Sequence, residues 1–356
     1  MKKQRILIIG LTPPVEGGSQ QHILHLVKNL NKEKFNVTLL TQKGTSCKEY
    51  TNCLEIDLGD KKGYSQSLAF YNGVKSKIPL MKDFDIVHIH ESYLFLLVAK
   101  IKAKVSAKVI LTVHGMKGFK YYNSKLLWKL FKERMTDADA LIAVSQTDKK
   151  LLIENFPKEK ISYIPNGVDL EPYTKNVAQI KNKITFIGRM HEQKGVAVLL
   201  KAFEEVSNSF PELRLELIGE VNGYARSLQS EFRNPNISWK GYLSNRDEIV
   251  QSLKSSYCIV IPSLWEGLPL TLFEALASER PVIVSDIETF KSVIKNDEAV
   301  MFKSEDAKDL AAKIVAVIQN RFTSDNYGKR GRTLAEKYNW VNIVNTFEGV
   351  YHKYGQ

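Results

Sequence analysis

Two glutamates in the stretch "PSLWEGLPLTLFEALA" are spaced so that both could contribute to one binding site. Glu266 and Glu274 stand eight positions apart, which on one continuous helix would separate them by about two turns. Gly267 and Pro269 disfavour a continuous helix from Glu266, whereas a proline is favourable near a first helical turn. The sequence therefore predicts Glu266 in a loop and Glu274 inside a helix that begins at about Leu270.

Two cations in the stretch "IGRMHEQKG" could hold a diphosphate. Arg189 and Lys194 follow an apolar, strand-like run and precede a helical pattern. Such a pair binds phosphate oxygens and can neutralise a departing diphosphate where other enzymes use magnesium. A carboxylate is poorly placed beside phosphate unless hydroxyl groups donate to it, as ribose and hexose hydroxyls do. Together with Glu266 and Glu274 the cations suggest a nucleotide-sugar site, although each alone could be a solvated surface charge.

Short apolar runs alternate with helical patterns along the chain, which is typical of parallel sheets covered by helices. The expected strands are residues 5–10, 36–41, 85–90, 108–115, 140–145, 161–166, 183–189, 213–220, 257–263 and 281–286. A polar, proline-containing stretch at 165–183 marks a linker. We expect an α/β fold of two doubly wound, Rossmann-like domains, at 1–170 and 171–337, that face each other across a cleft. Ligands bind such sheets beyond the carboxyl ends of the strands, where the four charged side chains are expected.

Composition is that of a globular protein without a membrane span. The 356 residues are 44% hydrophobic and 25% charged, and no run approaches the length of about 18 apolar residues that a membrane helix needs. The N-terminal apolar run is too short for a signal peptide core. Cys47, Cys53 and Cys258 suggest neither a metal cluster nor an even-numbered disulfide set, so we expect a reducing, cytoplasmic location.

The positive charge is concentrated in the first half of the chain. Residues 1–170 hold 27 Lys and Arg against 16 Asp and Glu, a net +11 of the total +12. Nucleic acid, an anionic membrane surface, an acidic substrate or ordinary solvated lysines could each account for this excess. The lack of aromatic stacking motifs on a basic strand argues against nucleic acid. The basic, aromatic segment Tyr121–Met135 could rest on an anionic membrane or could pack on the first sheet as an ordinary helix.

An ordered set of short motifs resembles the retaining nucleotide-sugar glycosyltransferases of GT-B fold, family 4. Besides the two stretches quoted above, it comprises Gly17–Gly18, "HIH" at His88–His90, "TVHG" at Thr112–Gly115, "DALIAVS" at Asp139–Ser145, "PNGVD" at Pro165–Asp169, and Trp340. In that family a final helix, here about 338–356, crosses back onto the first domain. The resemblance covers nearly the whole chain.

The resemblance implies a set of donor-binding residues, namely Gly17, Gly18, Arg189, Lys194, Glu266, Gly267, Leu268 and Glu274. Arg189 and Lys194 would bind the donor diphosphate, and Glu274 would accept the ribose hydroxyls. Glu266 would hold a hydroxyl of the donor sugar, and His114 would face the transferred sugar from the first domain. The glycine pair would approach the phosphate or the acceptor, although the same pair is compatible with a plain strand–helix turn.

The implied reaction is transfer of a hexosyl unit, with retention, to a hydroxyl of a cell-surface glycan or a lipid-linked precursor. UDP is the donor nucleotide that the family favours, GDP stays open, and neither a metal ion nor another cofactor is expected. Glu266, His114, Arg189 and Lys194 are the expected catalytic residues. The family pattern "ACGTPVV" is replaced by "ASERPVI" here, so Ser278–Arg280 stand where small residues are usual, which leaves the donor's identity open.

Several alternatives remain beside this interpretation. A nucleotide-sugar epimerase of the same fold or a catalytically silent binding protein would share the architecture. A glycosidase could use two carboxylates, but Arg189 and Lys194 would then have no task, so this reading is discounted. The D-x-D patterns at Asp83–Asp85 and Asp137–Asp139 precede strands and are expected to be caps and turns. His88 and His90 share a strand face, but no third metal ligand is evident, which favours packing or acceptor contact. His22 and His25 read as plain helix residues.

Overall fold

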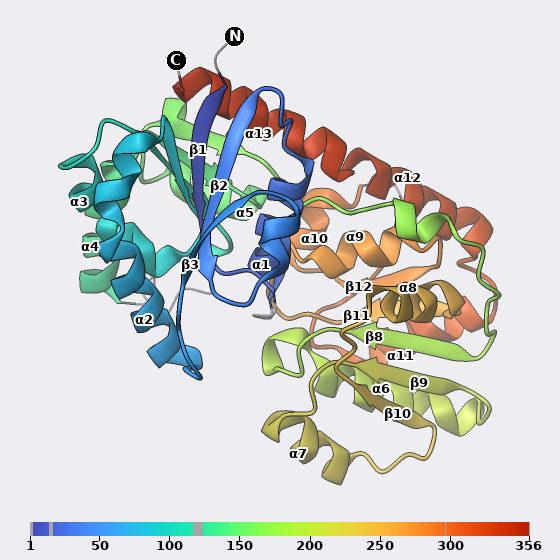
Figure 1. The fold of residues 1–356 in the computed structure, drawn as a ribbon. Helices are drawn as coiled ribbons and strands as arrows, with labels where there is room; N and C mark the ends of the chain where they lie inside the picture. Colours follow the sequence, from blue (N-terminus) through green and yellow to red (C-terminus); the bar gives the residue numbers. More distant parts are fainter. Residues whose placement is uncertain (1–2, 14–16, 117–123, 296, 356) are drawn as a thin grey trace. The chain divides into compact units, whose positions relative to one another are not determined.

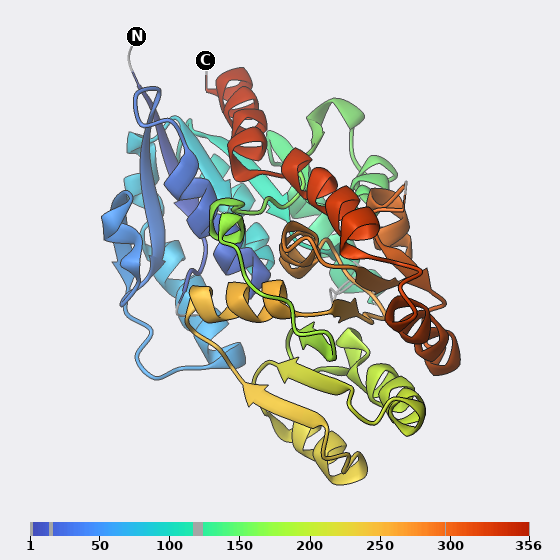
Figure 2. The same cartoon turned by 90° about the vertical axis from the view of Figure 1, so that its right-hand side faces the viewer.

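The computed structural model describes residues 3–13, 17–116, 124–295 and 297–355, and the chain separates into two compact units (Figures 1 and 2). One unit comprises residues 1–166 together with 340–356, and the other comprises residues 167–339. Each unit is an open parallel sheet with helices on both faces, as the alternating pattern of the sequence predicted. Each is described below by itself.

The first unit is built on a seven-stranded parallel sheet of order β3-β2-β1-β4-β5-β6-β7. Its strands are β1 Gln4–Ile9, β2 Phe35–Gln42, β3 Asn52–Ile56, β4 Ile86–Ile89, β5 Lys108–Val113, β6 Ala140–Ala143 and β7 Ile161–Tyr163. The inner strands β1, β4, β5 and β6 consist mainly of buried aliphatic residues, which is the pattern of a parallel sheet between two helical layers. The chain reverses its direction of growth between β1 and β4, so the loops after these two strands flank the switch point where such sheets bind ligands.

Helices cover both faces of this sheet. They are α1 Gly18–Asn29, α2 Gly63–Ser76, α3 Val98–Lys102, α4 Lys125–Thr136, α5 Gln146–Ile153 and α13 Trp340–Tyr354, with shorter 3-10 turns η1 Ser46–Glu49, η2 Ile78–Asp83, η3 Ser92–Leu97 and η5 Lys158–Lys160. One core cluster joins the sheet to α1 and to α13, the last helix of the chain, through Phe347 and Tyr351. The Lys34 ammonium, 3.1 Å from the buried Glu348 carboxylate, further ties α13 to this unit. The first and last parts of the chain therefore share one hydrophobic core.

The second unit repeats the plan with a six-stranded parallel sheet of order β10-β9-β8-β11-β12-β13. Its strands are β8 Lys183–Ile187, β9 Arg214–Ile218, β10 Ile237–Gly241, β11 Cys258–Ile261, β12 Val282–Ser285 and β13 Val300–Phe302. Its helices are α6 Val196–Ser209, α7 Gly223–Glu231, α8 Arg246–Ser255, α9 Leu270–Ala277, α10 Glu288–Val293, α11 Ala307–Ile318 and α12 Lys329–Lys337, with the short helices η6 Glu171–Thr174, η7 Glu192–Lys194 and η8 Ser324–Gly328. Here the switch point lies between β8 and β11.

One expectation about the cysteines is wrong. Cys47 and Cys53 form a disulfide, because the η1 turn brings Cys47 back beside the start of β3, with the two Cα atoms 6.4 Å apart. Cys258 is free and buried in β11, where burial raises the pKa of its thiol to about 12. Within the described residues, no helix combines the length and the apolar character that crossing a membrane requires.

Candidate functional site

The two loops at the switch point of the second unit, after β8 and after β11, pack directly against each other. The Leu264 amide donates to the carbonyl oxygen of Gln193 at 2.8 Å. Gly195 has a φ of 64°, and a side chain at this position would collide with the Pro262 carbonyl. A glycine is therefore required for the two loops to meet, and this contact sets the spacing between Lys194 and Glu266.

Lys194 and Glu266 form an ion pair across this contact. The Lys194 ammonium donates to Glu266 Oε1, which also accepts from the Ser263 hydroxyl at 2.9 Å. The two side chains are only 13% and 6% exposed. Since an uncompensated buried charge is costly, each partner offsets the cost of burying the other. The sequence placed both residues at one edge of the sheet, and the structure brings their charged groups together.

Gln193 links the remaining members of this group. Its amide nitrogen donates to the Trp265 carbonyl at 2.9 Å and to Glu266 Oε2 at 3.4 Å. Its amide oxygen accepts from the Arg189 guanidinium at 3.3 Å. Arg189, Lys194 and Glu266 thus belong to one hydrogen-bonded group, which we call the diphosphate clamp and which includes Gln193. The sequence analysis did not single out Gln193, although it lies within the quoted stretch.

The backbone around Glu266 is fixed by polar side chains from β12 and the helix after it. The Thr289 hydroxyl donates to the Glu266 carbonyl at 2.9 Å, and the Ser285 hydroxyl donates to the Ser263 carbonyl. Gly267 follows in the same loop, and Leu268 is buried in the core of this unit. Helix α9 then begins at Leu270, as predicted, with Pro269 as its N-terminal cap residue. Glu266 therefore lies in a loop that is held at both ends.

Glu274 lies inside α9 as predicted, but its partner comes from α8. The Arg246 guanidinium donates to Glu274 Oε1 at 2.5 Å and to the Tyr173 hydroxyl at 3.3 Å. The Glu274 side chain is 14% exposed. Arg246 also lies over the Tyr173 ring, 5.8 Å from its centroid, so the guanidinium is held on two sides. Neither Arg246 nor Tyr173 was anticipated from the sequence.

The residues that depart from the family pattern have structural roles. Ser278 is buried, and its hydroxyl donates to the Ala275 carbonyl within the last turn of α9. Glu279 has a φ of 59°, the left-handed conformation that explains why a glycine is usual at this position. The Arg280 guanidinium donates to the carbonyls of Lys254 and Val177. This loop follows the C-terminal end of α9, whereas Glu266 precedes its N-terminal end.

In the first unit, Gly17 and Gly18 lie at the start of α1, beside the switch point. Residues 14–16 of the same loop lie outside the described residues. Gly17 has a φ of 151°, and a side chain there would meet the Gln20 amide. Gln20 in turn donates to Glu91 Oε1 at 3.4 Å, and the Leu11 amide donates to the same oxygen at 3.2 Å. Burial raises the pKa of the Glu91 carboxyl to about 7.

His114 belongs to a cluster of histidines at the same sheet edge. His90 Nδ1 lies 3.1 Å from His114 Nε2, and the His22 ring lies 4.9 Å from the His114 ring between centroids. His22 Nδ1 donates to Asn166 Oδ1 at 2.8 Å. No third ligand beside His88 and His90 was evident from the sequence, and the fold brings His22 from α1 and His114 from the loop after β5 close to His90. His22 is consequently more than a plain helix residue.

Burial keeps these imidazoles neutral near pH 7. It lowers the pKa of His22 to about 4 and that of His88 to about 3, and it holds the pKa values of His90 and His114 well below the ordinary value. His88 is fully engaged, since its two ring nitrogens bond to the hydroxyls of Tyr351 and Thr112 at 2.7 Å each.

The D-x-D patterns behave as expected from their position before strands. Asp85 accepts from the Arg5 amide at 2.8 Å and pairs with its guanidinium at 3.1 Å, which fixes the start of β4. Asp139 pairs with Lys102 at 2.7 Å and accepts from the Val109 amide at 2.8 Å. Both carboxylates thus bind cationic side chains and backbone amides at the amino ends of strands.

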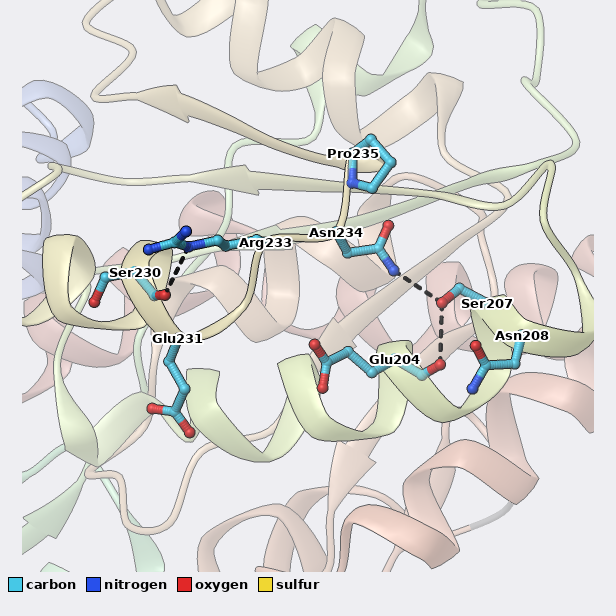
Figure 3. A pocket seen from close by; sticks show the side chains of 8 residues that line it. All are labelled: Glu204, Ser207, Asn208, Ser230, Glu231, Arg233, Asn234 and Pro235. Carbon is cyan, nitrogen blue, oxygen red and sulfur yellow. Dashed lines mark hydrogen bonds between the residues drawn. The ribbon is translucent and has the colours of Figure 1, made fainter.

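A polar hollow elsewhere in the second unit, near the C-terminal ends of α6 and α7, is not part of the predicted site. Figure 3 shows the side chains that line it, which are Glu204, Ser207, Asn208, Ser230, Glu231, Arg233, Asn234 and Pro235. The Asn234 amide donates to the Ser207 hydroxyl at 2.9 Å, and Arg233 donates to the Ser230 carbonyl at 3.2 Å. These bonds hold the chain after α7, and none of the eight residues belongs to the diphosphate clamp.

Comparison with known proteins agrees with this architecture. The solved sucrose-phosphate synthase of Thermosynechococcus elongatus superimposes with a TM-score of 0.82 at 17% identity, over 99% of both chains. Two Rossmann-like units of this kind define the GT-B class of glycosyltransferase fold. The profile of Glycosyltransferase Family 4 matches residues 16–172, and that of Glycosyl transferases group 1 matches residues 173–334. The chain belongs to glycosyltransferase family 4, which confirms the resemblance seen in its motifs.

Two curated relatives are similar over almost their full length. An uncharacterized glycosyltransferase of Methanocaldococcus jannaschii is 27% identical over 98% of both chains. The UDP-Gal:alpha-D-GlcNAc-diphosphoundecaprenol alpha-1,3-galactosyltransferase of Escherichia coli is 26% identical over 95% of this chain and 94% of its own. The chain is therefore a glycosyltransferase, and the choice of donor and acceptor is taken up next.

Proposed function

We propose that this glycosyltransferase transfers a hexosyl unit from a UDP-sugar, with retention and without a metal ion, to a hydroxyl of a lipid-linked glycan precursor. The observation that carries the proposal is the diphosphate clamp, in which Gln193 holds Arg189, Lys194 and Glu266 in one group. The Escherichia coli relative supports the choice of substrates, because its name gives UDP-galactose as donor and a diphosphoundecaprenol-linked sugar as acceptor.

The clamp suits the departure of a nucleoside diphosphate. An ammonium group has three donors, so Lys194 can keep its bond to Glu266 and still donate to a phosphate oxygen. The Arg189 guanidinium adds further donors of fixed geometry. Both cations would stabilise the charge that develops on the leaving diphosphate, and they replace the metal ion that other transferases use. Glu266 would accept a hydroxyl of the donor sugar, with the amides of Gly267 and Leu268 nearby.

The ribose is assigned to Glu274. Arg246 bonds to Oε1 of this carboxylate, which leaves Oε2 free to accept a ribose hydroxyl. The bond to Arg246 also fixes the carboxylate in one orientation before the donor binds. Arg246 is thus a positioning residue for the contact between Glu274 and the ribose, and Tyr173 holds the Arg246 guanidinium in place.

The residues of the first unit are assigned to the sugar and the acceptor. His114 is a neutral imidazole under assay conditions and would accept a hydrogen bond from a hydroxyl of the transferred sugar. The amides at Gly17 and Gly18, at the start of α1, would approach a phosphate of the donor or of the acceptor. After the diphosphate departs, the acceptor hydroxyl would attack from the same face and pass its proton to the leaving phosphate, which gives retention.

A lipid-linked acceptor requires access to a membrane surface, and we assign this contact to α4. The inner face of this helix packs into the core through Phe131 and Met135, whereas Leu126 is 79% exposed. Lys129 lies exposed on the same helix, and Lys132 is partly exposed. Exposed leucines beside lysines are typical of a helix that rests on an anionic lipid surface. The start of the predicted segment, at Tyr121, lies outside the described residues.

The transfer reaction itself tests the proposal. The protein is incubated with UDP-hexoses and a sugar-diphosphoprenol acceptor in EDTA, and the product is identified by mass and by the anomeric configuration of its new linkage. We expect an acceptor-dependent mass increase of one hexosyl unit with the donor's configuration, and its loss in Lys194→Met. Conversion of the donor sugar without acceptor would indicate an epimerase instead, and binding without turnover would indicate a silent protein.

The membrane contact is tested separately by flotation with vesicles that contain anionic phospholipid. We expect binding at low salt that weakens at high salt and is lost in Leu126→Glu. The control is Leu68→Glu, since Leu68 is also an exposed leucine, at 49%, and lies on α2. If the wild-type protein does not float at low salt, the assignment to α4 is wrong.

A further inference from the structure

Three histidines of the first unit are arranged so that one ring nitrogen from each can meet at a point. His22 comes from α1, His90 follows β4 and His114 follows β5. The three nitrogens lie within 4.8 Å of one another. Nitrogens that share a tetrahedral zinc ion lie about 3.4 Å apart, because each zinc–nitrogen bond is about 2.1 Å long. The three nitrogens therefore need to approach one another by at most about 1.4 Å.

Two of these histidines carry buried ring nitrogens without a partner among the described residues. Asn166 Oδ1 can only accept, so His22 Nδ1 carries the proton and His22 Nε2 has a bare lone pair. His22 is 0% exposed and His90 is 3% exposed, and Nε2 of each has no hydrogen-bond partner in the described structure. A buried polar atom left unpaired costs about 1–3 kcal/mol. Two such atoms on neighbouring rings, whose centroids lie 5.5 Å apart, indicate that the cluster can bind a ligand.

We propose that His22, His90 and His114 bind a divalent transition-metal ion of the zinc type. Three neutral imidazoles without a carboxylate suit zinc, copper or nickel, whereas magnesium and calcium require oxygen ligands. Three protein ligands leave a fourth position for water or substrate. His114 is only partly buried, so that position can be reached from solvent. His88 is excluded as a ligand because both its nitrogens are already bonded.

The surroundings of the cluster resemble those of known imidazole sites. A metal-bound histidine usually donates its second ring N–H to an oxygen acceptor, which fixes the ring and its tautomer, and Asn166 plays this part for His22. Metal binding competes with protonation of the ligands. Since burial already keeps the pKa values of these imidazoles low, no proton has to be displaced from them at pH 7.

The ion would act as an inhibitor of transfer, and this consequence rests on the proposed function. His114 is the residue that we assign to the transferred sugar. A metal ion bound to the ring nitrogen that accepts the sugar hydroxyl would occupy its lone pair, so His114 could no longer accept that hydrogen bond. Transfer is therefore expected to proceed in EDTA and to fall when zinc occupies the site. Binding and inhibition are separate measurements, so failure of one can be told from failure of the other.

Cobalt and zinc titrations of the tag-free protein, kept oxidised so that Cys47 and Cys53 stay paired, test the site. We expect one equivalent of Co²⁺ to give the visible absorption of a four-coordinate site and Zn²⁺ to displace it. His114→Gln and His90→Gln each remove a ligand and are expected to weaken Zn²⁺ binding at least tenfold. Asn166→Ala keeps all three ligands and is expected to weaken it about tenfold through the lost orienting bond. His352→Gln, an exposed histidine of α13, is the control and should bind as the wild type does.

Because His90 is buried, each variant is first compared with the wild type by thermal unfolding. If His90→Gln does not fold, His114→Gln, at the partly exposed position, tests the loss of a ligand in its place. The proposal is overturned if the wild-type protein binds no Zn²⁺ when Zn²⁺ is present at about 100 µM. A Kd above this concentration would be too weak for a specific site. It is equally overturned if binding persists unchanged in His114→Gln and Asn166→Ala. Zinc binding without inhibition of transfer would support the metal site and contradict the role of His114 toward the sugar.

Discussion

The Lys194 ammonium donates to the Glu266 carboxylate, although the two residues lie 72 positions apart in the chain. Their loops follow β8 and β11, the two strands that flank the switch point of the second unit. Doubly wound sheets bind their ligands at this point, beyond the carboxyl ends of the strands. The ion pair therefore joins the two loops at the point of the second unit where a ligand is expected to bind.

Replacing Lys194 by methionine is expected to reduce kcat/KM at least 100-fold, because a cation that stabilises the leaving diphosphate is lost. The same change leaves the Glu266 carboxylate, only 6% exposed, without its cation and should lower the free energy of unfolding by about 3 kcal/mol. In the double variant Lys194→Met with Glu266→Gln we expect stability to recover while transfer stays lost. Urea unfolding and steady-state kinetics measure the two effects.

The control for the Lys194 and Glu266 variants is Lys175→Met. Lys175 pairs with Asp247 at 3.0 Å, but both side chains are largely exposed, so the expected change in stability is within about 0.5 kcal/mol. Equal losses of stability in Lys175→Met and Lys194→Met would contradict the view that the clamp pair is special.

Because Glu274 pairs with Arg246, we predict that replacing either residue weakens only the binding of the ribose. Glu274→Gln and Arg246→Gln are each expected to weaken UDP binding about tenfold, since a hydrogen bond to a charged group is lost. Neither should change the affinity for inorganic pyrophosphate, which has no ribose. Calorimetric titration with both ligands measures this, and a parallel loss of pyrophosphate affinity would show that Glu274 does not act through the ribose.

Gly195→Ala is expected to lower the free energy of unfolding by about 2 kcal/mol and to weaken UDP binding. The residue has a φ of 64°, and its added methyl group would collide with the Pro262 carbonyl, which pushes the two loops of the clamp apart. Gly223→Ala is the matched control, because this glycine starts α7 with open space around it. Thermal unfolding and UDP titration of both variants compare them directly, and equal behaviour would contradict the packing argument.

The histidine cluster predicts that the protein loses stability in mild acid. The pKa of His22 is about 4 in the folded state and about 6.5 in the unfolded state, so the unfolded chain takes up more protons between these values. The stabilisation is complete above pH 6.5 and is lost as the pH falls toward 4. His22 alone accounts for about 2 kcal/mol between pH 7 and pH 5. Urea unfolding at both pH values should show this loss in the wild type and in His352→Gln, and a smaller loss in His22→Gln.

Local sequence rules were sufficient to predict the loop that contains Glu266 and the helix that contains Glu274. Gly267 and Pro269 leave the chain few alternatives, so the start of α9 at Leu270 followed from sequence alone. The strands that the sequence analysis did not identify are edge strands, namely β3 Asn52–Ile56, β10 Ile237–Gly241 and β13 Val300–Phe302. In β3 and β10 polar residues interrupt the apolar pattern and most side chains are partly exposed, and β13 has only three residues, so none of the three has the continuous apolar run of a central strand.

The partners of the site residues could not be predicted because they come from distant parts of the chain. Arg246 reaches Glu274 from a helix that begins 28 positions earlier, and no local spacing relates the two. In the same way His22 and Asn166 are 144 positions apart. The motifs therefore indicated which side chains to expect at the site, whereas the fold was needed to show which groups hold them in place.

Direct titration with nucleotides tests the central claim that the clamp binds a nucleoside diphosphate without a metal ion. Thermal unfolding of the protein is followed with UDP, GDP, ADP, TDP and CMP, each with and without EDTA, in the wild type and in Arg189→Ala and Glu274→Ala. We predict that UDP raises the unfolding midpoint equally with and without EDTA, and that the rise is smaller in both variants. If no nucleotide at millimolar concentration raises the midpoint, or if EDTA abolishes the rise, the claim is contradicted.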